Sequence, residues 1–178
     1  VPGLWVDLDV KDGAFRDRDH VREFLNSLEV VPSAVVFTGS GGAHAYWKFD
    51  TPQSCDVVRQ DALSWWAYQS SLSPVVIDKL CDPTRILRLP GSIRWPKKSG
   101  EEPAGVTTVY TGHTYSAQYL RSVSAEAYSQ YTARIERKRE EVQTGVLKAS
   151  QALFSISSDN QWSTMIAIAN MEEWFNQK

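Results

Sequence analysis

Apolar and polar residues alternate strictly near the start of the chain. Four apolar residues, Leu4, Val6, Leu8 and Val10, alternate with Trp5, Asp7 and Asp9. A period of two is typical of a half-buried β-strand, so we expect a strand over residues 4–10. Asp7 and Asp9 would project from the same face of this strand, and Asp12-Gly13 would end it.

A helix and a hairpin are predicted next. Asp17 or Asp19 can cap a helix whose apolar residues recur at helical spacing, namely Val21, Phe24, Leu25 and Leu28. The apolar residues 34–37 predict a second strand, residues 38–42 a glycine-rich turn, and residues 43–49 a third strand that pairs with the second.

The middle of the chain combines one helix with short strands. Ser54 or Asp56 can open a helix with apolar residues on one side, namely Val58, Ala62, Trp65 and Leu72. After Pro74, residues 75–77 predict a strand that ends on Asp78. Residues 85–89 predict another strand, halted at Pro90-Gly91, and residues 105–110 one more.

The pattern changes beyond Ser116. Apolar residues with mixed charges predict one or two surface helices as far as Glu141, and a last amphipathic helix is predicted over 162–175. We therefore place a domain boundary near residue 115.

Composition and charge bound the class of protein. At 178 residues and 42% hydrophobic, the chain can form one globular domain, or one domain with a small appendage. Its apolar runs fall far short of the ~20 residues that span a bilayer, so we expect a soluble, intracellular protein. Cys55 and Cys81 lack metal-site spacing and are interpreted as ordinary thiols. Because the chain begins at Val1, we expect it to be a piece of a longer protein.

Three segments carry candidate chemistry. On one strand face, the carboxylates of Asp7 and Asp9 would lie ~7 Å apart, and such oxygen ligands suit Mg²⁺ or Mn²⁺. Asp78, which also ends an apolar stretch, favours the same interpretation. Two acids on the solvated face of an edge strand would be the structural alternative.

The turn over 38–42 leads directly into His44. Its glycines let backbone N–H groups approach a phosphate, and His44 can face the same anion, although a tight turn with a structural histidine is the alternative.

The segment 85–98 contains basic residues and no acidic one: Arg85, Arg88, Arg94, Lys97 and Lys98. These residues can bind triphosphate or nucleic acid, or form a solvated surface with ion pairs.

Taken in order, the three segments resemble the three motifs of the archaeo-eukaryotic primase superfamily, and most closely the primase-polymerase domains of phage and plasmid replication proteins. Asp7 and Asp9 match its first motif, a hydrophobic strand ending in Asp-x-Asp. The small-residue turn that leads to His44 and an aromatic strand matches the second. Asp78 with Arg85, Arg88 and the turn over 89–92 matches the third, and Asp82 is the alternative aspartate.

The resemblance implies an α+β fold. Residues 1–115 would be the catalytic core, with a mixed β-sheet and an RRM-like element but without the strands that precede the first motif in the family. Residues 116–178 would be a helical extension. The implied activity is that of a DNA primase-polymerase, which joins dNTP or rNTP units under the direction of a single-stranded DNA template.

The resemblance also implies a site. Asp7, Asp9 and Asp78 would be catalytic and would hold two Mg²⁺ or Mn²⁺ ions. The triphosphate would be bound by Thr38, Ser40, Gly42, His44, Arg85 and Arg88. Arg94, Lys97 and Lys98 would contact DNA. A fused or associated helicase is an expected partner, and a phage-encoded protein would act in the host cytoplasm.

Two other functions stay open. A non-catalytic module that binds single-stranded DNA would use the basic segment and exposed aromatic residues, although three acids would repel phosphate unless a metal neutralised them. A rolling-circle nickase would need a His-x-His pair, and His20, His44 and His113 do not form one.

Overall fold

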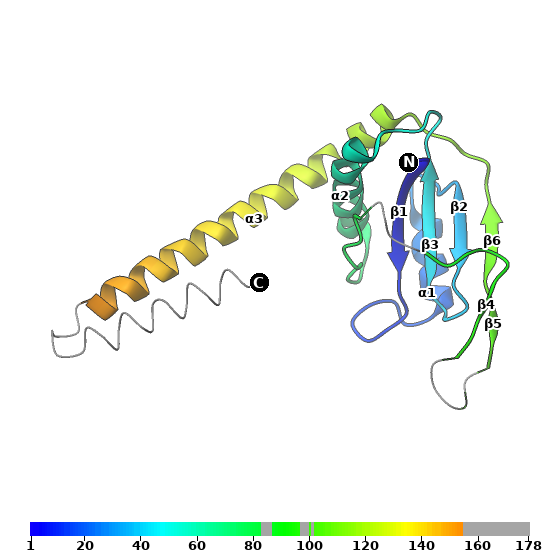
Figure 1. Ribbon diagram of the computed structural model, residues 1–178, viewed down its shortest axis with the longest axis horizontal. Helices are drawn as coiled ribbons and strands as arrows, with labels where there is room; N and C mark the ends of the chain where they lie inside the picture. Colours follow the sequence, from blue (N-terminus) through cyan, green and yellow to red (C-terminus); the bar gives the residue numbers. More distant parts are fainter. Residues whose placement is uncertain (83–86, 97–99, 101, 155–178) are drawn as a thin grey trace. The chain divides into compact units, whose positions relative to one another are not determined.

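A computed structural model describes residues 1–82, 87–96, 100 and 102–154 of the chain. Its principal feature is a four-stranded antiparallel sheet in the order β1-β3-β2-β6. The strands are β1 (Gly3–Leu8), β2 (Ala34–Phe37), β3 (Ala43–Lys48) and β6 (Thr107–Tyr110). A second, two-stranded sheet pairs β4 (Ile93–Arg94) with β5 (Ala104–Gly105). Figure 1 shows α1 behind the larger sheet and α2 beside β1, which is a mixed α+β architecture.

Two helices cover one face of the large sheet. These are α1 (Arg18–Ser27) and α2 (Cys55–Leu72). The core that they share with the sheet contains Leu4, Val6 and Leu8 from β1, Val21 and Phe24 from α1, and Val58, Ala62 and Trp65 from α2. The period of two in β1 and the helical period in α1 and α2 therefore direct their apolar residues into one core.

The other face of the sheet carries the polar candidates. In the β1–β3 register, Asp7 lies opposite His44 and Trp5 lies opposite Tyr46. These four residues share the sheet face opposite the helices, and Trp5 on this face is also buried and belongs to the hydrophobic core. The segment before β4 crosses this face in front of β3 (Figure 1), and its Arg88 is hydrogen-bonded to Thr38.

The caps agree in part with the sequence. Asp17 caps α1, because its Oδ1 accepts a hydrogen bond from the backbone N–H of His20 at 2.8 Å. That bond also lowers the pKa of the Asp17 carboxyl. Ser54 occupies the N-cap position of α2 without a side-chain cap bond. Leu72, expected on the buried side of α2, is 47% exposed.

Several predicted strands need correction. The strand predicted over 4–10 ends at Leu8, because the chain after it folds back and the carbonyl of Asp9 accepts from the N–H of Phe15. Residues 75–77 form no strand, since the indole N–H of Trp66 occupies the carbonyl of Ile77 in place of a neighbouring strand.

The later strands differ as well. Residues 87–89 are not in a strand, and the rest of the strand predicted over 85–89 lies outside the described residues. The strand predicted over 105–110 is divided into β5 and β6 at Val106, whose backbone bonds to Ser92 and Gly91.

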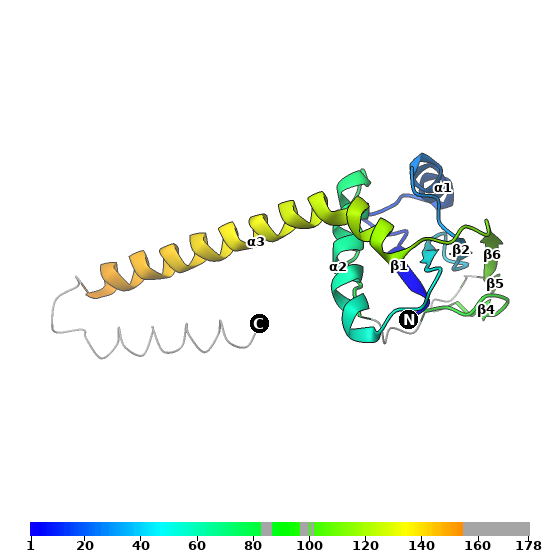
Figure 2. The same cartoon turned by 90° about the horizontal axis from the view of Figure 1, so that it is seen from above.

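Of the one or two helices predicted beyond Ser116, the structure forms one, α3 (Ala117–Phe154), which continues past Glu141. The helix predicted over 162–175 lies outside the described residues. The chain divides into two compact units, Val1–Tyr131 and Thr132–Lys178. Figure 2 shows the first turns of α3 beside α2, where Leu120 and Ser124 are buried and the two hydroxyls of Ser64 and Ser124 lie 2.7 Å apart. The functional boundary near residue 115 stays a prediction.

No described helix combines the length and the apolar character that a membrane span requires.

Candidate nucleotide and metal site

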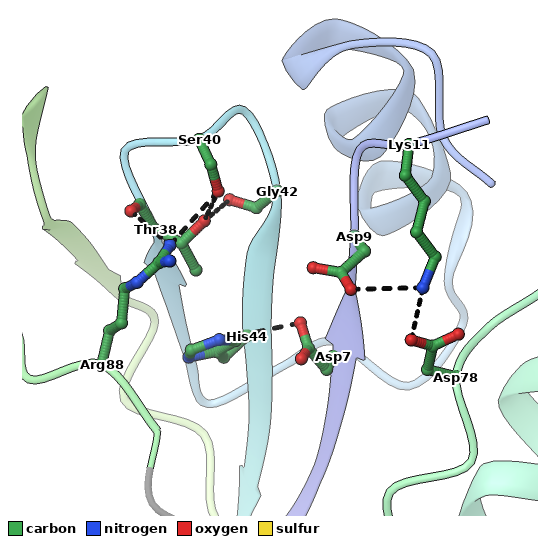
Figure 3. A network of polar contacts seen from close by, with 9 residues as sticks. All are labelled: Asp7, Asp9, Lys11, Thr38, Ser40, Gly42, His44, Asp78 and Arg88. Carbon is green, nitrogen blue, oxygen red and sulfur yellow. Dashed lines mark hydrogen bonds and ion pairs between the residues drawn. The ribbon is translucent and has the colours of Figure 1, made fainter. Parts of the chain in front are cut away.

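The first two aspartates lie at the end of β1. Asp7 is on the strand, and Asp9 follows its last residue. Figure 3 shows both side chains on the same side of this strand end, facing the space between β3 and the segment that carries Asp78. The expected shared face is therefore present, although the strand stops before Asp9.

Asp78 reaches the same place from a distant part of the sequence. The ammonium of Lys11 lies 2.5 Å from Asp78 Oδ2 and 3.4 Å from Asp9 Oδ2. One cation thus joins two of the three carboxylates (Figure 3). The hydrogen bond to Asp78 is the largest cause that raises the pKa of Lys11 above its ordinary value. Asp82, the alternative third aspartate, is exposed.

The shared ammonium bears on whether these residues fit a metal ion. Among the described residues, no group of three histidine, cysteine or acidic side chains has its ligand atoms gathered as a metal centre. The carboxylates of Asp9 and Asp78 nevertheless converge on one cation, and paired carboxylate oxygens are the ligands that Mg²⁺ and Mn²⁺ prefer. The chemistry of these two donors therefore suits a divalent ion, and a cation, the ammonium of Lys11, already lies against both of them.

The glycine-rich turn joins β2 to β3 and is closed by its own hydrogen bonds. The backbone N–H of Thr38 donates to the carbonyl of Gly42 at 3.0 Å, and Thr38 Oγ1 lies 3.1 Å from the same carbonyl oxygen and 2.8 Å from Ser40 Oγ. Gly39 and Gly41 have φ of 74° and 92°, which L side chains rarely adopt. Thr38 is buried and braces the turn, whereas Ser40 is exposed.

Arg88 joins this turn from the segment before β4. Its Nη1 donates to the carbonyl of Thr38 at 2.8 Å and to Ser40 Oγ at 3.2 Å. The guanidinium is thereby fixed beside the turn, on the opposite side of His44 from the acids (Figure 3). A fixed planar guanidinium is suited to binding phosphate oxygens.

His44 lies between the acidic and the basic halves of the site. Its Nε2 is 3.7 Å from Asp7 Oδ1, and its side chain is almost fully buried. Burial, and secondarily the charge of Arg88, lowers the pKa of His44 to about 4, against the smaller opposing effect of Asp9. His44 is therefore neutral near pH 7 and has one N–H donor. Its Nδ1 is buried without a hydrogen-bond partner among the described atoms.

Of the remaining candidate residues, the structure describes only Arg94. Arg85, Lys97 and Lys98 lie outside the described residues. Arg94 is on β4 and partly buried, and its neighbour Trp95 is 71% exposed. The predicted DNA contacts therefore stay predictions.

Lys11 is the residue that the sequence analysis missed. It continues the period of two that contains Asp7 and Asp9, which was the available signal.

No protein-family model and no curated protein matches this chain. Among solved structures, the archaeo-eukaryotic primase domain of the primase-polymerase of cyanophage S-2L is similar, with a TM-score of 0.50 and 22% identity over 69% of this chain and 60% of that one. The primase RepB′ gives a TM-score of 0.48 and 15% identity, covering 94% of this chain and 57% of that one. This chain thus spans less than two thirds of either structure.

The first of these similarities defines the fold. The chain has an α+β fold like that of the cyanophage domain, as the resemblance implied. The sheets formed by the described residues are antiparallel, however, and not mixed as expected.

Proposed function

We propose that this chain is the catalytic core of a DNA primase-polymerase. It would join dNTP or rNTP units on a single-stranded DNA template during phage or plasmid replication. The observation that carries the proposal is the arrangement in Figure 3, where three carboxylates and a turn bound by Arg88 lie on either side of His44. The fold of a primase-polymerase domain supports the same activity.

The acidic half would hold the metal. Asp7, Asp9 and Asp78 would bind two Mg²⁺ or Mn²⁺ ions, which supply Lewis-acid activation of a 3′-hydroxyl and charge neutralisation on the triphosphate. Asp78 is preferred to Asp82 because Asp78 shares a cation with Asp9. The three carboxylates would also fix the position of the bound ions, because their backbone is held in place. Strand β1 holds Asp7 and, directly after its last residue, Asp9, and the hydrogen bond from the Trp66 indole to the carbonyl of Ile77 holds the residue before Asp78.

The turn and its neighbours would hold the triphosphate. Arg88 is fixed by Thr38 and Ser40 at the edge of the turn, where its charge would offset phosphate charge. The neutral imidazole of His44 has one N–H group, so it can donate a hydrogen bond to a phosphate oxygen without first taking up a proton. Gly42 would let the backbone approach, and Arg85 would add a second guanidinium. Arg94, Lys97 and Lys98 would contact the template.

Incorporation of labelled nucleotides tests the proposal. The wild-type chain is given dNTP or rNTP on a single-stranded template, with and without an annealed primer, in Mg²⁺ or Mn²⁺. Product that depends on metal and is lost in the Asp7→Asn/Asp9→Asn double variant is expected. Asp19→Asn, an exposed acid on α1, is the matched control and should retain activity.

Two results of this experiment would contradict different parts of the proposal. If a folded wild-type chain yields no product in any lane yet binds single-stranded DNA, the activity is wrong and a non-catalytic DNA-binding module replaces it. Product that persists in the folded double variant would contradict the assigned roles of Asp7 and Asp9.

A further inference from the structure

Lys11 is held in place on both sides by backbone hydrogen bonds. Its N–H donates to the carbonyl of Phe15 at 3.3 Å, and its carbonyl accepts from the N–H of Ala14 at 3.0 Å. The short loop after β1 therefore fixes the Cα of Lys11 close to the end of the strand. Its side chain extends from there to the carboxylates of Asp9 and Asp78 (Figure 3).

The two ion pairs do little for the stability of the fold. The side chain of Lys11 is 46% exposed, as is that of Asp9, and that of Asp78 is 39% exposed. Ion pairs at such exposure are screened by water and are worth little. Lys11 could leave its present position for solvent at small cost, so its effect is on the site rather than on folding.

The ammonium and a divalent ion exclude one another. Lysine carries a compact charge with three donors on a flexible stem, so its head takes the place of a small cation between carboxylate oxygens. A divalent ion that bound Asp9 and Asp78 would need the same oxygens, and it would repel a positive charge within ~4 Å. The two cations therefore cannot occupy these oxygens together. When a divalent ion binds, the ammonium of Lys11 has to move away, while the backbone keeps the residue beside the site.

We propose that Lys11 is an internal cation that holds Asp9 and Asp78 together before metal binds and is displaced by the incoming ion. This inference rests on the proposed metal site. Lys11 therefore competes with the metal ion for Asp9 and Asp78. The ion binds only when its free concentration is high enough to displace the ammonium. A free divalent ion binds more weakly than the carboxylates alone would allow, and the displaced ammonium is released towards solvent.

Mn²⁺ binding to the full chain tests the competition without any measurement of activity. Free Mn²⁺ is followed by electron paramagnetic resonance during titration of wild type, Lys11→Met and Lys138→Met. Methionine keeps much of the length of the side chain and removes its charge. Lys138 is an exposed lysine on α3 and serves as the matched control. Lys11→Met is expected to bind Mn²⁺ about fivefold more tightly, in keeping with the loss of weak competing ion pairs, and Lys138→Met as wild type does.

Displacement itself needs a second readout, because removal of any nearby positive charge favours a cation. Reductive methylation of lysines in the wild-type chain is compared with and without Mg²⁺, and each site is quantified by mass spectrometry. Methylation of Lys11 should rise several-fold with Mg²⁺, whereas that of Lys138 should not change. Methylation of Lys11 that is unchanged or reduced by Mg²⁺ would overturn the proposal, as would unchanged or weaker Mn²⁺ binding by Lys11→Met.

The titration also separates this inference from the proposed function. If wild type and Lys11→Met both fail to bind Mn²⁺, or if Asp78→Asn binds it as wild type does, the metal site itself is wrong and the role of Lys11 falls with it. If Asp78→Asn weakens binding but Lys11→Met leaves it unchanged, the site stands and only the role of Lys11 is wrong.

Discussion

The guanidinium of Arg88 donates a hydrogen bond to the main-chain carbonyl oxygen of Thr38 at 2.8 Å. The same Nη1 lies 3.2 Å from Ser40 Oγ. A residue from the segment before β4 is thus held by the turn between β2 and β3. This relationship places a fixed positive charge beside a buried histidine, on the far side of that histidine from the acids.

Arg88→Ala should weaken binding of a nucleoside triphosphate at least tenfold, because charge-assisted bonds to phosphate are worth roughly 2 kcal/mol or more. Arg88→Lys should restore only part of the affinity, since an ammonium cannot bond to the turn and to phosphate through one planar fork. Isothermal titration with dATP and Mg²⁺ measures both. Arg22→Ala, which removes an exposed guanidinium from α1, is the control. Wild-type affinity in Arg88→Ala would show that the triphosphate binds elsewhere.

Gly42→Ala should destabilise the domain by about 1–3 kcal/mol, because the added methyl group meets packed backbone. A Cβ at this position would lie 2.5 Å from the carbonyl oxygen of Leu8, so the turn or β1 must shift. Gly105→Ala is the matched control, since a Cβ there meets nothing within 4 Å. Urea unfolding followed by circular dichroism compares the two. Equal stability of both variants would mean that the turn does not rest against the end of β1.

The buried His44 should make the metal-free protein less stable in acid. The pKa of His44 is about 4 in the folded chain against an ordinary value of 6.5. The unfolded chain therefore takes up a proton first as the pH falls. The contribution of His44 is complete above pH 6.5 and is lost progressively from there to pH 4, by an amount on the order of 3 kcal/mol.

The measurement is unfolding free energy in EDTA at intervals from pH 8 to pH 4, for wild type and His44→Gln. The variant removes the titrating group, so its stability should fall less steeply over this window. Other acids titrate in both proteins and cancel in the difference. Parallel curves would show that His44 is not buried in its neutral form.

The start of α3 should behave as part of the core. Leu120 is 1% exposed, and Leu147, further along the same helix, is 60% exposed. Leu120→Ala should therefore cost about 2–5 kcal/mol of unfolding free energy, and Leu147→Ala less than about 0.5 kcal/mol. Thermal and urea unfolding of the two variants provide the comparison. Similar small losses would mean that residues from 116 onward are separable, as a boundary near residue 115 would require.

Much of the fold follows from periodicity. The apolar period of two in β1 correctly predicted that Leu4, Val6 and Leu8 enter the core, and the helical period in α1 did so for Val21 and Phe24. Trp5, on the alternate positions of β1, is nevertheless also buried. Short elements were harder, because hydrogen bonds from outside the local sequence decide them. Residues 75–77 have strand-forming side chains, yet the carbonyl of Ile77 is taken by the indole of Trp66, so no ladder forms.

The site was predictable as a set of segments but not as a set of contacts. Asp7, His44 and Arg88 were each marked by their motifs. The bond from Arg88 to the turn and the bridge from Lys11 to Asp78 join residues far apart in the chain, so no local pattern contains them. A predicted acidic pair also does not reveal that a lysine shortly after the strand pairs with one of its members, Asp9, and with the distant Asp78.

The most direct test of the central claim is to locate Mn²⁺ and a non-hydrolysable nucleoside triphosphate in crystals of the chain by anomalous scattering. The account predicts a manganese peak within coordination distance of Asp9 and Asp78, with the triphosphate against His44 and Arg88 and with Lys11 Nζ moved away from both acids. Manganese or nucleotide bound elsewhere, with Lys11 still bridging Asp9 and Asp78, would contradict it.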